Sequence, residues 1–365
     1  MCFERIFDII LERIAFGTVS IYQSSAPFIY KAYFGLWRIL GSQASVLSVS
    51  VANSLMVNSN ERGRALEFAV AHELENSLKK RVFVEVTERT IEQNRKHWMY
   101  FNALDKGTQK SFLSCARTFA GWIEKSGWLE GATKVSLDRI PDNEAKGELG
   151  ATDIQLSIFF PSGIVLKNIS VKHGHDALCH PRLPSLAEQA GVNDPQKDAE
   201  YRKGYEKIWG EFYSKTKKII PNPTTYKELD RAKPGFKNDT LFAPLLKHAT
   251  KFLSGNATSP GNAKRFFQYI VGQVDYYVLK NGKDTIQLKH FVGISPPQSF
   301  TITYPYKSRK NTFLAEFDNR WKITFRIHTA TSKISENGQV VMTEKIDPIC
   351  RNLAEVIKIE TIKKQ

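Results

Sequence analysis

The segment GATDIQLSIFFPSGIVLKNISVKH, residues 150–173, decides the fold of this 365-residue chain. Two apolar runs, rich in β-branched and aromatic residues, flank Pro161-Ser162-Gly163, a combination that favours a tight turn. Gly163 can adopt the positive φ that such a turn demands. The sequence therefore predicts a β-hairpin, with Asp153 near the start of its first strand and Lys172 near the end of its second.

The register of this hairpin decides what Asp153 and Lys172 can do together. If Pro161 and Ile164 lie opposite each other, paired positions sum to 325, and Asp153 then faces Lys172. A carboxylate and an ammonium would lie side by side at the end away from the turn. A slip of one residue would turn one of them to the opposite face. A structural ion pair at a strand end is the alternative interpretation.

An aspartate beside a lysine on neighbouring strands fits metal-dependent cleavage of phosphodiesters. The carboxylate of Asp153 would hold Mg²⁺, a hard cation that prefers oxygen ligands. The ion would polarise the phosphate and lower the pKa of a bound water. Lys172 would orient that water or stabilise charge in the transition state.

The usual form of this pattern has an acidic residue two positions before the lysine, where this chain has Ser170. A second metal-binding carboxylate must then come from elsewhere. We expect it to be Glu67, because the helix predicted for GRALEFAV could pack against the hairpin. Glu73 and Glu148 are the alternatives.

A histidine-rich segment follows Lys172 directly, with His173, His175, Cys179 and His180 in KHGHDALCH. These four side chains could bind zinc, which needs about four N or S ligands in tetrahedral reach. Adjacent Cys179 and His180 are unusual for such a site, and solvated loop residues are the simpler interpretation. We assign His173, His175, His180 and Arg182 to contacts with phosphates or bases.

The charge of the chain indicates a polyanionic partner. Lys and Arg number 52 against 37 Asp and Glu, which gives +15. Residues 236–365 carry 20 basic and 10 acidic side chains, so this region alone contributes +10. A basic region suits DNA, because each neutralised phosphate releases condensed counterions. A merely basic, soluble surface is the alternative.

Cysteine usage and hydropathy bear on the compartment. Four cysteines lie far apart with no CxxC, which argues against a disulfide framework and favours a reducing cytoplasm. Residues 39–60 form the longest uncharged run, but Ser and Asn are too frequent there for a membrane span. We expect a cytoplasmic protein without a membrane partner.

Residues 1–55 differ from the rest, being apolar and aromatic without a clear helical pattern. We expect Met56 to be the native start and the preceding residues to be an extension of the gene model; an N-terminal helical addition is the alternative. After Met56, Asn60 can cap a helix whose apolar residues recur at helical spacing. A short strand is expected at Val82–Val86.

Further along, the pattern predicts helices over 89–126, with Trp98 and Phe101 in the core, and over 200–220, with an aromatic stripe. Breaks near 221–238 place a domain boundary at about residue 235. The segment FDNRWKITFRIHTA, residues 317–330, predicts a second hairpin that turns at Asp318-Asn319. In its second strand the polar face carries Lys322, Thr324, Arg326 and His328.

Three segments resemble the HaeIII-type restriction endonucleases. GATDIQLSIFFPSGIVLKNISVKHGHDALCHPRLPSL resembles the central block of that family, with its aspartate, its lysine-histidine motif and its His-x-Arg-Leu segment. ERGRALEFAVAHEL resembles the N-terminal helix, and FDNRWKITFRIHTATSKI resembles a C-terminal segment of the family. The order of the segments agrees too, and the resemblance covers roughly residues 60–350.

The resemblance implies an α/β fold with a PD-(D/E)xK nuclease core, a mixed central sheet flanked by helices. We assign 56–235 to that core and 236–365 to a basic α+β DNA-recognition region. The implied activity is Mg²⁺-dependent hydrolysis of double-stranded DNA at a short palindrome, GGCC in the namesake. Asp153 matches the metal-binding aspartate and Lys172 the catalytic lysine. Ser170 departs from the usual acid, and Thr152 replaces the proline of the motif.

Recognition of G·C pairs requires donors to guanine, which Arg and Lys provide. We assign Lys322, Arg326 and His328 to DNA contacts, and Arg309 and Lys310 to phosphates. A cognate DNA methyltransferase is the expected functional partner. A palindromic target suggests a homodimer, with a monomer as the alternative. A DNA-binding protein without catalytic activity is the second function that the sequence allows.

Overall fold

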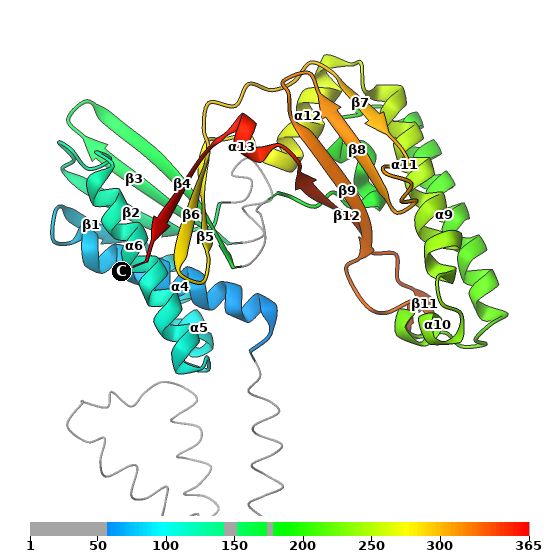
Figure 1. Ribbon diagram of the computed structural model, residues 1–365, viewed down its shortest axis with the longest axis horizontal. Helices are drawn as coiled ribbons and strands as arrows, with labels where there is room; N and C mark the ends of the chain where they lie inside the picture. The colour runs from blue at the N-terminus through cyan, green and yellow to red at the C-terminus, as the bar shows by residue number, and fades with distance from the viewer. Residues whose placement is uncertain (1–56, 142–151, 174–177, 365) are drawn as a thin grey trace, which may run out of the picture. The chain divides into compact units, whose positions relative to one another are not determined.

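The computed structural model of the chain describes residues 57–141, 152–173 and 178–364 (Figure 1). The predictions made for residues 1–55, Glu148 and His175 fall outside these ranges. Among the described residues, no helix combines the length and apolar character that crossing a membrane requires. The architecture is mixed α/β, with a large mixed sheet flanked by helices, as the sequence predicts at this level of detail.

The larger sheet has seven strands. In spatial order they are β1 (Phe83–Val86), β2 (Lys134–Arg139), β3 (Ile154–Phe160), β4 (Gly163–His173), β5 (Tyr276–Asn281), β6 (Thr285–Phe291) and β13 (Lys358–Lys363). The pairs β1–β2 and β4–β5 are parallel, and the remaining neighbours are antiparallel. The sheet therefore takes strands from both sides of the boundary predicted near residue 235.

Three helices from the first part of the chain contact this sheet: α4 (Ser59–Leu78), α5 (Glu88–Asn102) and α6 (Lys106–Lys125). Helix α4 packs against both of the others and also contacts β4. It begins with a capping box, in which the side chain of Asn58 accepts from the amide of Glu61 and the Glu61 carboxylate accepts in return. The predicted helix is confirmed, but its cap is Asn58 rather than Asn60.

The region 89–126 is helical, as predicted, and is divided into two helices. Helix α5 ends at Asn102, and Asp105 caps α6 by accepting from the amide of Thr108 at 2.9 Å. The break changes which residues of α5 are buried, because α5 no longer shares the periodicity of α6. Phe101 is buried as predicted, whereas Trp98 is 55% exposed and its prediction as a core residue is wrong.

The central hairpin is present, but its register differs from the prediction. Phe160 pairs with Gly163, so paired positions sum to 323 and not to 325. The reason is Pro161, which has no N–H to donate to a strand ladder. In the observed turn, Phe160 to Gly163, proline occupies the second position and glycine the fourth, which both residues favour. A shift of two positions keeps every side chain on its predicted face. Asp153, one residue before β3, consequently lies opposite Ser170 instead of Lys172.

The smaller sheet is formed entirely by residues after 235. Its four antiparallel strands are, in spatial order, β12 (Glu344–Cys350), β9 (Lys322–Thr329), β8 (Thr312–Phe317) and β7 (Phe300–Thr303), and a short pair is formed by β10 (Ser335–Glu336) and β11 (Gln339–Val340). The predicted late hairpin is β8–β9. In β9 the side chains of Ile323, Phe325 and Ile327 are buried. Lys322 and Arg326 are exposed, as the alternation predicts.

The remaining helices contribute to the core around the smaller sheet. They are η3 (Leu183–Ser185), α8 (Leu186–Gln189), α9 (Pro195–Lys217), α10 (Tyr226–Ala232), η4 (Asn238–Phe242), α11 (Ala243–Asn256), α12 (Pro260–Val271) and α13 (Leu353–Val356). The aromatic stripe of α9 is core packing. One carboxylate is buried among these rings, because Glu344 accepts hydrogen bonds from Tyr205, Trp209 and Tyr226 at 2.5, 2.7 and 3.1 Å.

Candidate active site

Asp153 is fixed by three hydrogen bonds that all end on one of its oxygens. Oδ2 accepts from the Ser170 hydroxyl at 3.1 Å, the Val171 amide at 2.6 Å and the Lys172 ammonium at 3.0 Å. These donors follow one another along β4, so the hairpin itself holds the carboxylate in place. The other oxygen, Oδ1, accepts none of these bonds.

Lys172 is confirmed as the neighbour of Asp153, although it does not lie directly opposite. Its side chain is 19% exposed and that of Asp153 is 14% exposed. Burial disfavours the charged ammonium, but the carboxylates of Asp153 and Glu67 outweigh this effect and raise the pKa of Lys172. Lys172 is therefore a cation at neutral pH, suited to donate hydrogen bonds and to stabilise negative charge.

Glu67 reaches the same place from helix α4. Burial and the nearby charge of Asp153 raise the pKa of Glu67 to about 7, although Arg139 and Lys172 act in the opposite direction. Of the two alternatives to Glu67, Glu73 pairs with Arg117 at 3.2 Å, and Glu148 lies outside the described residues. The structure thus brings together two carboxylates and one lysine, from α4, from the residue before β3 and from β4.

Arg139, at the end of β2, is a member of the site that the sequence analysis missed. Its side chain is fully buried and its Nη2 donates to Glu67 Oε2 at 2.6 Å. The same nitrogen contacts His97 Nδ1 at 2.9 Å, and Nη1 donates to Asn94 Oδ1 at 3.0 Å. Arginine can only donate, so His97 Nδ1 must be the acceptor. Arg139 thereby fixes the position of Glu67.

His97 is held neutral by this arrangement. Burial, together with the charges of Arg139 and Arg64, lowers the pKa of His97 to about 3. A neutral ring keeps its lone pair for the Arg139 contact throughout the physiological range. Only a weak sequence signal points to Arg139, which stands at the end of the alternating segment KVSLDR, at a position that faces inward.

The site has the donor set that a magnesium ion needs. Mg²⁺ prefers oxygen ligands and is usually held by one or two carboxylates, with water and substrate phosphates completing its shell. Asp153 and Glu67 each use one oxygen for a fixed hydrogen-bonding partner, which leaves Asp153 Oδ1 and Glu67 Oε1 to coordinate. Burial and, after it, repulsion from Asp153 raise the pKa of Glu67, and a divalent cation would relieve the repulsion. Ser170, at the position where the usual pattern has a second acid, is fully buried and donates its hydroxyl to Asp153.

A basic cavity lies next to the lysine. Cys179 forms part of its wall and lies close enough to Lys172 for the two groups to influence each other's pKa. The cavity has a volume of about 670 Å³. Its lining includes three cationic side chains, one carboxylate and several amides: Arg182, Arg265, Lys345, Glu188, Gln189, Asn193, Gln268 and Gln273. This composition suits phosphate and the edges of nucleobases.

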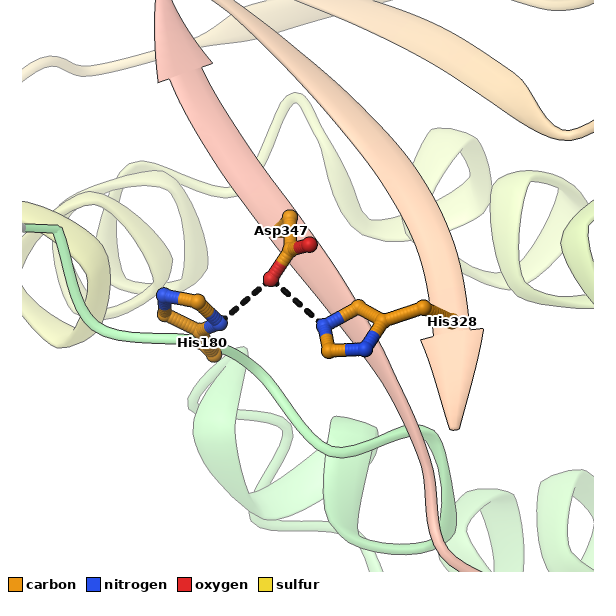
Figure 2. Close-up of side chains that lie close together, drawn as sticks. All are labelled: His180, His328 and Asp347. Atoms are coloured by element: carbon orange, nitrogen blue, oxygen red, sulfur yellow. Dashed lines mark hydrogen bonds and ion pairs between the residues drawn. The ribbon is translucent and has the colours of Figure 1, made fainter. Parts of the chain in front are cut away.

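A second cluster joins His180, His328 and Asp347 (Figure 2). Asp347 Oδ1 lies 2.5 Å from His180 Nδ1 and 2.6 Å from His328 Nε2. Burial favours the neutral acid, but the close contacts and charges of the two histidines hold the pKa of Asp347 well below its usual range. Asp347, within EKIDPIC, was not predicted, because its partners lie 19 and 167 positions away in sequence.

The other residues assigned to DNA do not gather at one point. His173 packs edge-on against Phe112, with 5.2 Å between the ring centroids. Arg326 and Lys322 lie exposed on β9, where they pair with Asp347 at 3.7 Å and Glu316 at 2.9 Å. Arg182, Arg309 and Lys310 are exposed, and Lys310 is 3.6 Å from Asp239. The zinc set that the sequence analysis considered is not assembled among the described residues, since His180 turns toward β12.

A search with protein-family models and a search of the curated proteins each found no match to this chain.

Proposed function

We propose that this protein is a type II restriction endonuclease that hydrolyses double-stranded DNA with Mg²⁺. The observation that carries the proposal is the meeting of Asp153 and Lys172 at 3.0 Å on neighbouring strands, beside Glu67. The net charge of +15 and the basic cavity next to Lys172 supply a surface for a polyanion. The mixed sheet flanked by helices is compatible with the PD-(D/E)xK core that the sequence resemblance implies.

Each member of the site has a distinct role in this proposal. Bound Mg²⁺ would polarise the scissile phosphate and lower the pKa of a water molecule. Asp153 Oδ1 and Glu67 Oε1 would hold the ion, while Arg139 keeps Glu67 in place. Lys172, a cation because of its raised pKa, donates to the attacking water or to a phosphate oxygen and stabilises the charge that develops there.

Sequence recognition would depend on the region after residue 235. Arg326, Lys322 and His328 lie on the polar face of β9, and the family resemblance points to a short palindrome, GGCC. A two-fold target calls for two copies of the chain. Such an enzyme would act together with a methyltransferase that protects the host DNA.

The experiment is a plasmid digest with the full chain and Mg²⁺, followed by sequencing of the DNA ends. Asp153→Asn and Lys172→Met should each lower the cleavage rate by about 100-fold or more, because each removes a group that acts on the transition state. Binding to the same DNA should persist. Asp230→Asn is the matched control, since Asp230 also pairs with a lysine, Lys237, at 3.1 Å but lies outside the site.

Discrete fragments from the wild type and from Asp230→Asn, and none from the two site variants, would support the proposal. Normal cleavage by both site variants would refute the proposal.

The second candidate function is DNA binding without cleavage, and it rests on Ser170, which occupies the place of the usual acid. In that case the chain would bind duplex DNA in a salt-sensitive manner and leave it intact with every divalent metal tested.

A further inference from the structure

The cluster of His180, His328 and Asp347 combines three metal-ligating side chains from three separate segments (Figure 2). His180 belongs to the loop that follows β4, His328 to β9 and Asp347 to β12. One nitrogen from each ring and one carboxylate oxygen all lie within 4.8 Å of one another. His180 also lines the basic cavity next to Lys172, but none of the three is among the four residues Asp153, Glu67, Lys172 and Arg139.

The orientation of His328 is fixed by its second nitrogen. Nδ1 lies 3.0 Å from the carbonyl oxygen of Thr329, which can only accept, so Nδ1 carries a proton. In the neutral ring, Nε2 is then a lone pair that faces Asp347 Oδ1 at 2.6 Å. A contact this short needs either a second proton on the ring, as in a His–Asp ion pair, or a metal ion bound by both atoms. A ring N–H donated to a backbone carbonyl is also the usual arrangement of a metal-bound histidine.

His180 supports the same reading. Its Nδ1 is buried and lies 2.5 Å from Asp347 Oδ1, yet it makes no hydrogen bond with any described residue. The ring is therefore close to the carboxylate without directing an N–H at it. Arg326, 61% exposed, approaches the other oxygen, Oδ2, at 3.7 Å. Oδ1 is thus the oxygen on which both rings converge.

We propose that His180 Nδ1, His328 Nε2 and Asp347 Oδ1 bind a divalent transition-metal ion of the zinc class. Two imidazoles favour zinc over Mg²⁺ or Ca²⁺, which prefer oxygen ligands. Zinc bonds of about 2.0–2.2 Å in tetrahedral geometry require the ligand atoms to separate by roughly 1 Å more than they do here. His180 can supply its part of that movement, because its side chain is 38% exposed and it stands on a loop. The contact between His328 and Asp347, at 2.6 Å, must widen as well, by rotation of the Asp347 carboxylate.

The ion would fasten the loop after β4 to the smaller sheet. That loop already pairs with β12, because the amide of Ile346 donates to the Pro181 carbonyl at 2.9 Å and Arg182 forms a β-bridge with Lys345. A metal at His180 would add a bond from the loop to both β9 and β12. This role does not depend on nuclease activity, so the inference can be tested independently of the proposed function.

The test is a zinc titration of the full, metal-stripped chain by calorimetry, in excess Mg²⁺ to occupy sites built from oxygen. The wild type should bind one zinc ion per chain. His328→Gln and Asp347→Asn should each weaken binding by about 100-fold or more, since even outer partners of a metal ligand commonly contribute 10- to 100-fold. Co²⁺ in place of zinc gives a visible spectrum that reports nitrogen ligation directly.

Two control variants separate this site from others. His72→Gln removes an exposed histidine on α4, and Asp153→Asn alters the candidate active site; both should bind zinc like the wild type. If His328→Gln fails to fold by circular dichroism, His180→Gln in the loop replaces it. The proposal is overturned if the wild type binds no zinc, if the cluster variants bind it unchanged, or if Asp153→Asn abolishes binding.

Discussion

Replacing Glu67 with glutamine should remove a specific part of the pH dependence of stability. Burial and Asp153 raise the pKa of Glu67 from 4.5 to about 7. A carboxyl with a raised pKa in the folded state stabilises the fold when it is protonated. That stabilisation is complete below about pH 4.5 and is lost as the pH rises through about 7.

The size of the effect follows from the shift. One pKa unit corresponds to about 1.4 kcal/mol, and the linkage relation gives a loss of roughly 2–3 kcal/mol in the free energy of unfolding between about pH 5 and about pH 8. Glutamine resembles the protonated acid and cannot lose a proton. The difference in stability between Glu67→Gln and the wild type should therefore grow by about this amount across the range, in favour of the variant.

The assay is urea unfolding of both proteins in EDTA at a series of pH values. Taking the difference in unfolding free energy between the two proteins cancels the contributions of the other titrating groups. Glu73→Gln, the same change on the same helix, is the control and should not reproduce the trend. Mg²⁺ should flatten the wild-type curve if the ion binds the ionised carboxylates. A difference that stays constant from about pH 5 to about pH 8 would refute the placement of Glu67 beside Asp153.

Three further outcomes are expected. Glu344→Ala should lower the free energy of unfolding by about 3–5 kcal/mol, measured by denaturant titration, because it leaves three buried donors without their acceptor. Gly204→Ala should destabilise the protein by about 1–3 kcal/mol in the same assay, because a Cβ there would lie 2.3 Å from Cε1 of His248. Arg309→Ala should weaken binding to any duplex and reduce the slope of log affinity against log salt by about 1, measured by fluorescence anisotropy.

The central hairpin shows how far local sequence signals reach. Pro161, Ser162 and Gly163 predicted the turn, and the alternation of the strands predicted which side chains share a face. The pairing was displaced by two positions because the prediction placed Pro161 in the ladder, where its missing N–H is a disadvantage. The displacement kept Asp153 and Lys172 together, because side chains on a strand repeat every two residues.

The residues that escaped prediction depend on contacts between distant segments. Arg139 meets Glu67 across 72 positions, and Asp347 meets His180 across 167. No local period links such pairs, and a charged residue at an inward position gives only a hint that a partner exists. Trp98 was misplaced for a related reason, since the break between α5 and α6 reset the helical face that is buried.

The hydrogen bonds that end on a single oxygen of Asp153 bear on ion selectivity. With Oδ2 bound by three donors, the side chain cannot rotate to offer both oxygens, and Glu67 is restricted in the same way by Arg139. Calcium commonly takes both oxygens of a carboxylate within a shell of six to eight ligands, whereas magnesium accepts one from each and fills the rest with water. Discrimination between the two ions would then arise from the restricted rotation of two acids, with no need for a cage of fixed size.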